Sequence, residues 1–350
     1  MIQQKMIGDV LASTVICESI KYHFPDALVH FVAYENTLPV LLNNPHIDKV
    51  IIFGNELRES KWAFYKFLKS LGKEKYFAVI DAYGKLESNL ISLFTTSKYK
   101  ISHYKSYTRW IYTHTVVENL NPDGRIPLAI ENRLALLQPI LDRPGNFLTS
   151  PKIFLKESEI REASESVKSI KNHPDQKLIM IGILGSSGLK TYPPKYIAEV
   201  LNIICDQVDA KLLFNYIPSQ KEEAQAIYNK CNEKTKAQID LDFYASSLRK
   251  FIALLSQCNA LIGNEGGAVN MAKALGVPTF CIFSPFIIKG AWHSENKSLH
   301  YGIHLSDYYP QKLEKMDNKE IKRNIVALYA SLEPKLFKEP LLEFLKKYCQ

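Results

Sequence analysis

The sequence contains no apolar run close to the roughly 18 residues that a membrane-spanning helix needs. Its first ten residues, MIQQKMIGDV, are too polar, and their apolar part is too short, for a secretory signal peptide. These two absences exclude an integral membrane anchor from our expectations. They predict a cytoplasmic protein, or one held peripherally at the inner face of the cytoplasmic membrane.

Metal-binding and disulfide patterns are also missing. The six cysteines, none of which forms a CxxC pair, are Cys17, Cys205, Cys231, Cys258, Cys281 and Cys349. Their spacing predicts neither a zinc site nor a disulfide framework, and their apolar surroundings favour small core residues. The nine histidines contain no HExxH pattern, and Asp240-Leu241-Asp242 matches DxD only at the end of a predicted strand. We therefore expect no metal and no bound cofactor.

The charge is moderately basic, with a formal net value of +8. This excess fits an anionic ligand, an anionic membrane surface or nucleic acid, and does not choose among them. A basic stretch interleaved with aromatic residues runs over 99–110, and we interpret it as acceptor-binding or surface structure. We therefore expect no nucleic-acid partner.

Length and periodicity predict two α/β domains. A chain of 350 residues is comfortable for two domains of about 150 residues each. In the first half, strands are expected at 28–33, 49–53, 77–81 and 100–103, and helices at 10–23, 61–71 and 86–94. Alternation of strands and helices with short loops predicts a parallel sheet covered on both faces.

The beginning of the chain does not match a Rossmann-like opening strand, because only Met1 and Ile2 precede the polar run Gln3-Gln4-Lys5. Either the first strand is very short or the chain begins a few residues late, and we favour the second explanation.

A proline-rich stretch between about 120 and 175 separates the two halves, and it contains Pro122, Pro127, Pro139, Pro144, Gly145, Pro151 and Pro174. After it, strands are expected at 177–184, 210–215, 238–242, 260–263 and 278–283. Helices are expected at 194–208, 221–231, 247–258, 267–275 and 340–348. We predict an N-terminal acceptor-binding domain over 1–150, a connecting segment over 151–175, a C-terminal nucleotide-sugar-binding domain over 176–325 and a helical segment over 326–350. The last helix is a candidate to pack back across the N-terminal domain.

The most informative segment runs from residue 261 to 285. An apolar strand leads into Gly263-Asn264-Glu265-Gly266-Gly267 and directly into a helix. Adjacent glycines let a ligand approach the backbone, and the first helical turn offers free N–H groups and a partial positive charge. A diphosphate fits this turn, although a merely tight turn explains the glycines as well.

Two further segments carry candidate polar groups. The segment GILGSSGLKTYPP also leaves a buried strand for a helix, and it offers the hydroxyls of Ser186 and Ser187 and the charge of Lys190. A surface lysine is the alternative. Near the N-terminus, Gly8-Asp9 precedes the first helix, where Asp9 is either a helix-capping residue or a carboxylate facing a cleft between the domains.

In this order and spacing, the three segments resemble glycosyltransferase family 9, the ADP-heptose–lipopolysaccharide heptosyltransferases. The family's I-G-D motif matches Ile7-Gly8-Asp9, and its K-x-W-P motif matches residues 190–193. Its signature G-N-D-[ST]-G-x-x-H-[LIM]-A-x-A-L-G-x-P matches residues 263–278, and the resemblance covers nearly the whole chain. The departures, which bear on the donor more than on the fold or reaction, are Tyr192 for Trp, Glu265 for Asp, Gly266 for Ser or Thr, and Asn270 for His.

The resemblance implies a GT-B architecture, in which two Rossmann-like domains face each other across a cleft. It implies an inverting, metal-independent transferase that moves heptose from ADP-heptose or a similar nucleotide sugar to a lipopolysaccharide-core or related glycan acceptor at the inner membrane surface. Asp9 and Lys190 would be catalytic, as general base and leaving-group stabiliser, with Gly8 at the acceptor. The donor would contact Ser186, Ser187, Glu265, Gly266, Gly267 and Asn270. Two alternatives remain open: a GT-B nucleotide-sugar epimerase, and a nucleotide-sugar-binding protein without turnover.

Overall fold

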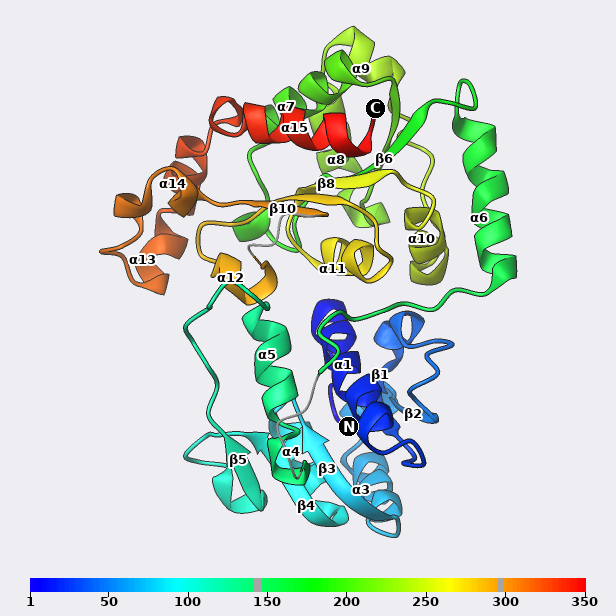
Figure 1. The fold of residues 1–350 in the computed structure, drawn as a ribbon, viewed down its shortest axis with the longest axis vertical. Helices are drawn as coiled ribbons and strands as arrows, with labels where there is room; N and C mark the ends of the chain where they lie inside the picture. The colour runs from blue at the N-terminus through cyan, green and yellow to red at the C-terminus, as the bar shows by residue number, and fades with distance from the viewer. Residues whose placement is uncertain (142–146, 295–298) are drawn as a thin grey trace. The chain divides into compact units, whose positions relative to one another are not determined.

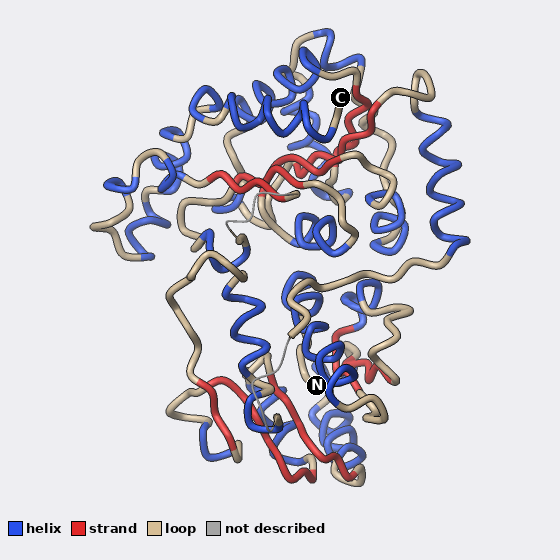
Figure 2. The backbone as a smooth tube through the Cα atoms, in the orientation of Figure 1, coloured by secondary structure: helices blue, strands red, loops and turns tan. Residues whose placement is uncertain are grey.

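A computed structural model describes residues 1–141, 147–294 and 299–350. Pro144 and Gly145 of the proline-rich stretch lie outside the described residues. The chain divides into two compact units, Met1–Phe154 and Leu155–Gln350. Each unit is an α/β structure with parallel strands and surrounding helices (Figures 1 and 2). The predicted α/β fold is confirmed in both halves.

Unit 1 contains five short strands, which are β1 (His30–Tyr34), β2 (Lys49–Phe53), β3 (Lys75–Asp81), β4 (Thr96–His103) and β5 (His114–Val116). The pairs β1–β2, β3–β4 and β4–β5 are all parallel. Ile2 joins the two groups, because it bridges Val32 of β1 and Asp81 of β3, both in parallel. The order from edge to edge is therefore β2, β1, Ile2, β3, β4, β5, which is the strand order of a Rossmann-like sheet. The first strand is thus reduced to a single bridging residue.

Three helices of unit 1, α1, α3 and α4, agree closely with the predicted ranges, and two others, α2 and α5, were not predicted. The helices are α1 (Ile7–His23), α2 (Glu56–Glu59), α3 (Lys61–Leu71), α4 (Leu86–Phe94) and α5 (Leu128–Ala135), and the short 3₁₀ turns are η1 (Glu35–Val40), η2 (Arg109–Ile111) and η3 (Gln138–Ile140). Leu68 and Leu71 of α3 lie in the core with Ile2, Phe53 and Ile91. The apolar spacing that predicted α3 is the spacing that buries this face.

Unit 2 contains β6 (Lys177–Gly182), β7 (Ala210–Phe214), β8 (Ala260–Asn264), β9 (Thr279–Ile282) and β10 (His300–Ile303), all parallel and in the order β10-β9-β8-β6-β7. The predicted strand over 238–242 is wrong as a strand, because only Ile239 bridges Leu212. The side chain of Asp240 accepts the N–H groups of Asp242 and Phe243, and this turn replaces continued strand pairing. The Ile239–Leu212 bridge nonetheless extends the sheet beyond β7. The order β10, β9, β8, β6, β7, Ile239 is again that of a Rossmann-like sheet.

Helices cover both faces of this sheet, with α7 and α15 on one side and α10 and α11 on the other (Figure 1). The helices of unit 2 are α6 (Glu157–Ile170), α7 (Pro194–Gln207), α8 (Lys221–Tyr228), α9 (Glu233–Ala237), α10 (Leu248–Leu255), α11 (Gly267–Ala274), α12 (Lys289–Trp292), α13 (Asn318–Arg323), α14 (Ile325–Ser331) and α15 (Lys338–Tyr348). The 3₁₀ turns are η4 (Gly188–Lys190), η5 (Pro218–Gln220), η6 (Leu305–Asp307), η7 (Pro310–Lys312) and η8 (Pro334–Leu336).

One expectation about the connection between the two halves needs correction. The range 151–175 is not merely a connecting segment, because it contains α6, a helix of unit 2 whose Glu159 is bonded to Arg249 of α10. The C-terminal helix is part of unit 2. Leu341 and Phe344 of α15 lie in the core of unit 2, where apolar side chains lose the most contact with water.

The structure also bears on the cysteines and on membrane-spanning helices. All six cysteines are free and buried, as predicted for small core residues. Within 1–141, 147–294 and 299–350, no helix combines the length and the apolarity that crossing a bilayer requires.

Candidate functional site

The candidate base, Asp9, lies in the first turn of α1, just after the Ile2 bridge. The helix is capped at Met6, which has a positive φ of 56° and makes no side-chain capping bond. Asp9 is therefore not the capping residue. Its carboxylate instead accepts a 2.7 Å hydrogen bond from the Arg133 guanidinium, and about a third of the side chain, 32%, remains exposed.

Arg133 comes from α5, and the sequence analysis did not single it out. Besides Asp9, its guanidinium donates to Ser13 Oγ at 2.8 Å and to the Ala129 carbonyl at 2.6 Å. Its side chain is only 10% exposed. Three acceptors fix the planar fork in one orientation, so the Asp9 carboxylate is held in one place. In the sequence, an arginine on an otherwise apolar helix face is the feature that could mark this residue. The surrounding prolines instead favour a connecting segment.

Asp9 and Arg133 line a cavity of about 390 Å³ within unit 1. It lies at the carboxyl end of the Ile2 bridge and of β3, the point where strand order reverses and where doubly wound sheets bind ligands. Its wall mixes charges of both signs, and the residues lining it are Gln3, Lys5, Met6, Asp9, Ala82, Tyr83, Lys85, His103, Glu118, Ala129, Asn132 and Arg133. Burial lowers the pKa of His103 and raises that of Tyr83 to about 12, so both are neutral at pH 7.

The loop after β3, which forms one wall of this cavity, is fixed by the buried Asp81. Its carboxylate accepts the N–H groups of Tyr83 and Gly84 and the hydroxyl of Tyr112, at 2.7–2.9 Å. Burial raises the pKa of Asp81, and these hydrogen bonds oppose that rise. The network holds the backbone of residues 81–84 against the end of the strand.

In unit 2, two distant loops meet at the carboxyl ends of β6 and β8. Asn264 donates from its amide to the carbonyls of Gly182 and Ile183 at 2.8 and 3.0 Å, and it accepts from the Tyr192 N–H at 2.7 Å. The Lys190 ammonium lies 2.9 Å from Glu265 Oε1, and Glu265 is only 7% exposed. Lys190 of the first segment and Glu265 of the second, both predicted at the site, are thereby brought together.

The loop that carries Ser186 and Ser187 folds back on itself. Thr191 Oγ1 accepts from the Gly185 N–H at 3.1 Å and donates to the Ser187 carbonyl at 2.9 Å. Ser284 also donates to the Leu189 carbonyl at 2.6 Å. Ser186 and Ser187 are exposed, so their hydroxyls are accessible to a ligand.

Tyr192, which stands where the resembling family has Trp, is a core residue. It is fully buried, packs near Tyr196, Tyr329 and Phe337, and donates its hydroxyl to the Leu332 carbonyl. Burial raises its pKa. Its contribution is to anchor the end of the Lys190 loop in unit 2.

The turn into α11 has the geometry expected of a phosphate-binding turn. Gly266, the residue before the helix, has a φ of 151°, and a Cβ built there would meet no atom within 4 Å. The first N–H groups of α11, from Gly267 onward, have no partner within the helix. Asn270 lies half-buried one turn later, with its N–H bonded to the Gly266 carbonyl at 3.3 Å. The backbone is thus open to an anion at a helix N-terminus.

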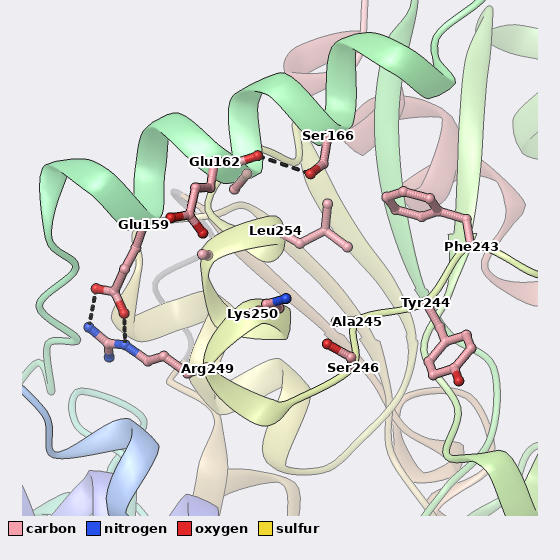
Figure 3. Close-up of a pocket in the computed structure, with 12 residues that line it drawn as sticks. Glu159, Glu162, Ser166, Phe243, Tyr244, Ala245, Ser246, Arg249, Lys250 and Leu254 are labelled. Atoms are coloured by element: carbon pink, nitrogen blue, oxygen red, sulfur yellow. Dashed lines mark hydrogen bonds and ion pairs between the residues drawn. The ribbon is translucent and has the colours of Figure 1, made fainter.

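A different pocket, of about 440 Å³, lies between α6 and α10 (Figure 3). Arg249 and Glu159 form a bidentate pair at its rim, at 2.6 and 2.8 Å. None of the predicted donor residues lines it. The part of the chain that the structure describes also contains no group of three or more His, Cys, Asp or Glu that could hold a metal.

These features define a class of protein, namely an α/β protein with two Rossmann-like units, each with a polar site at its strand-order reversal. The chain belongs to glycosyltransferase family 9 (heptosyltransferase), because the family model matches residues 64–291. It is therefore a glycosyltransferase of the heptosyltransferase family.

Relatives agree with this membership. Lipopolysaccharide heptosyltransferase 1 of Campylobacter coli is 24% identical over 291 residues, which cover 81% of this chain and 82% of the relative. Lipopolysaccharide heptosyltransferase 3 of Escherichia coli is 25% identical over 141 residues, covering 38% and 40%.

Solved structures agree in fold. A glycosyl transferase family 9 protein from Veillonella parvula superposes with a TM-score of 0.76 at 16% identity, covering 99% of this chain and 95% of that one. The ADP-heptose lps heptosyltransferase II of Escherichia coli gives 0.68 at 17% identity, covering 95% and 98%. Escherichia coli heptosyltransferase WaaC with ADP gives 0.67 at 15% identity, covering 93% and 98%. The fold is that of the GT-B heptosyltransferases.

Proposed function

We propose that this protein transfers heptose, with inversion and without a metal, from ADP-heptose or a similar nucleotide sugar to a lipopolysaccharide-core or related glycan acceptor. Two observations on relatives support the donor and the acceptor. Their names specify lipopolysaccharide heptosyltransferases, and WaaC has been solved with ADP and with ADP-2-deoxy-2-fluoro heptose. The proposed acceptor places the protein peripherally at the inner face of the cytoplasmic membrane.

The placement of Asp9 carries the mechanism. An acceptor hydroxyl has a pKa far above 7, so it needs a base as it attacks the anomeric carbon. Asp9 is a partly exposed carboxylate at the edge of a cavity, and Arg133 holds one of its oxygens. The other oxygen takes the proton. Gly8, which was expected at the acceptor, is buried in α1 and does not line this cavity.

Lys190 and the N-terminus of α11 provide the donor half. As the glycosidic bond breaks, the departing diphosphate gains charge, and preorganised positive groups stabilise it there. The Lys190 ammonium and the N–H groups after Gly266 are such groups, and they can take the place of a divalent cation. Ser186, Ser187 and Asn270 contact the donor, and Glu265 orients Lys190 through their 2.9 Å ion pair.

Asp9→Asn tests the proposal. This variant keeps the shape and removes the proton acceptor, so turnover of ADP-heptose with a lipopolysaccharide-core acceptor should fall by about 10²–10⁴-fold. Donor affinity should change little. Thermal stability should fall only modestly, because Asp9 does not cap the helix and the asparagine oxygen can still accept the Arg133 hydrogen bond, although the ion pair with this buried guanidinium is lost. Asp26→Asn, at an exposed carboxylate beyond the end of α1, is the matched control and should retain full turnover. Retention of more than about a tenth of turnover by Asp9→Asn would mean that Asp9 is not the base.

The same assay separates the two alternatives. An epimerase would convert the nucleotide sugar in the absence of any acceptor, and a binding protein would retain the nucleotide sugar without consuming it. Family membership favours transfer over both.

A further inference from the structure

Helix α3 of unit 1 has two chemically different faces. Phe64, Phe67, Leu68 and Leu71 pack in or against the core of the unit. The opposite face carries two large aromatic side chains, with Trp62 63% and Tyr65 43% exposed. An aromatic pair of this size on an exposed face of an anchored helix indicates an interaction surface.

This face is also strongly basic. From residue 61 to 75 the chain has one carboxylate, Glu74, and five lysines, all of them exposed: Lys61, Lys66, Lys69, Lys73 and Lys75. The patch extends onto the adjoining strand ends, because Thr96 Oγ1 donates to the Gly72 carbonyl at 3.4 Å. There, Lys98 lies over the rings of Phe77 and Tyr99, and Phe77 is 62% exposed. We call residues 61–75, with Phe77 and Lys98, the α3 surface.

We propose that the α3 surface docks this protein onto a bilayer that contains anionic lipids. Lysines near a negative membrane surface contribute attraction of about 1 kcal/mol each, and tryptophan and tyrosine favour the boundary between headgroups and hydrocarbon. Helix α3 is anchored by its buried face, so Trp62 and Tyr65 can enter the headgroup layer while the lysine ammonium groups remain in water.

The ring geometry favours a membrane over single-stranded nucleic acid. Trp62 stacks on Tyr65, with centroids 5.6 Å apart and planes 21° apart, and the Lys66 ammonium lies 5.3 Å from the Trp62 centroid. Bases bind to open aromatic faces. Here Tyr65 and Lys66 already lie over the Trp62 ring, whereas insertion into a headgroup layer needs only ring edges and the indole N–H.

The first test measures sedimentation of the full chain with vesicles. Wild type should bind vesicles of phosphatidylcholine mixed with phosphatidylglycerol, more weakly as salt rises, and should not bind phosphatidylcholine alone. Lys66→Glu/Lys69→Glu should lower the partition coefficient at least about 25-fold, about fivefold for each lysine removed. Lys168→Glu/Lys230→Glu makes the same change in net charge at exposed positions of unit 2 and should leave binding unchanged. Equal loss in this control, or no binding by wild type, would overturn the proposal.

The second test locates the contact. The chain has three tryptophans, so Trp110→Phe/Trp292→Phe leaves Trp62 as the only one, and its emission should shift to the blue on mixed vesicles. In Trp62→Phe/Trp292→Phe, which leaves the exposed Trp110, emission should not shift. A shift at Trp110 alone, or binding of single-stranded DNA instead of vesicles, would refute the assignment. The inference rests on the proposed function only for which membrane the protein meets, namely the cytoplasmic membrane at its inner face. Both tests are done without donor and acceptor, so they do not depend on turnover. An inactive protein that binds vesicles would therefore refute the proposed function alone.

Discussion

At the scale of single residues, the most consequential contact is the one between Arg133 and Asp9. An isolated carboxylate on the first turn of a helix would sample several rotamers, and each would present the base differently. Arg133 holds the Asp9 carboxylate in one rotamer. Its own guanidinium is fixed as well, because Ser13, Ala129 and Asp9 all accept hydrogen bonds from it at 2.6–2.8 Å. Arg133 is therefore a positioning residue for the proposed base.

Substitution of Arg133 separates geometry from charge. Arg133→Lys keeps the charge but not the three hydrogen bonds of the guanidinium, so kcat should fall about 10-fold. Arg133→Gln loses both the charge and this geometry, so kcat should fall about 100-fold. The KM for the donor, whose proposed site is in unit 2, should stay the same. Added guanidinium should partly restore kcat in a smaller variant, Arg133→Ala, and not in Asp9→Asn. A purely structural role would instead lower stability in all three Arg133 variants without any rescue of kcat.

The ion pair of Lys190 with Glu265 allows a second residue-scale test. Lys190→Ala should lower kcat more than it raises KM, since its charge matters most as the diphosphate departs. It should also lower stability, because it leaves the 7% exposed Glu265 carboxylate unpaired. Lys190→Ala/Glu265→Gln should recover stability and not kcat. Recovery of both in the double variant would show that Lys190 serves only the fold.

At the scale of elements, two glycines shape the end of β8, where we propose the donor site. Gly263 has a φ of 134°, and a Cβ there would come within 2.4 Å of the Gly182 carbonyl on β6. No such contact exists at Gly266, three residues later, where only the φ of 151° favours glycine. The first glycine allows β6 and β8 to pair closely, and the second shapes the turn into α11.

The two glycines should therefore fail differently. Gly263→Ala should lower both the melting temperature and the binding of ADP, because backbone atoms must move. Gly266→Ala should add about 1–3 kcal/mol of backbone strain. Relative to this loss of stability, its loss of ADP binding should be larger than in Gly263→Ala, because the N–H groups of α11 turn away from the ligand. A thermal-shift titration with ADP measures both effects. Unchanged ADP affinity in Gly266→Ala would argue against a phosphate site at this turn.

At the scale of the whole molecule, the acid stability of unit 2 should depend on His300. Burial, with a contribution from Lys273, lowers its pKa from 6.5 to about 4. The unfolded chain takes up this proton near pH 6.5 and the folded chain only near pH 4. Stability from the neutral ring is thus complete above pH 6.5 and is lost as pH falls toward 4, by at most about 3 kcal/mol.

Urea unfolding at a series of pH values measures this loss. His300→Asn keeps a polar partner for Thr279, which lies 3.1 Å from the ring in wild type, and should lack this part of the pH dependence. His114→Asn, at an exposed histidine of unit 1, should leave the profile as it is. Parallel profiles for wild type and His300→Asn between pH 6.5 and 4 would contradict the assignment.

Local sequence patterns were sufficient for most elements. Helices over 61–71 and 86–94 and the strand over 49–53 agree with α3, α4 and β2 residue for residue. The apolar periods that define these elements are those that bury them. The glycine-rich turn between β8 and α11 could also be predicted, because positive φ values and an exposed helix N-terminus require glycine locally.

Only the tertiary structure decided the contacts that make the candidate sites. Arg133 and Asp9 are 124 residues apart, Asn264 and Gly182 are 82 apart, and nothing in the local pattern of either partner specifies the other. Ile2 and Ile239 each complete a sheet as a single bridging residue, which is too short to produce a strand period. Helix and strand formation follows from neighbours along the chain, and it was predictable for that reason. The orientation of a carboxylate and the pairing of distant strand ends follow from packing of the whole unit, which no segment encodes alone.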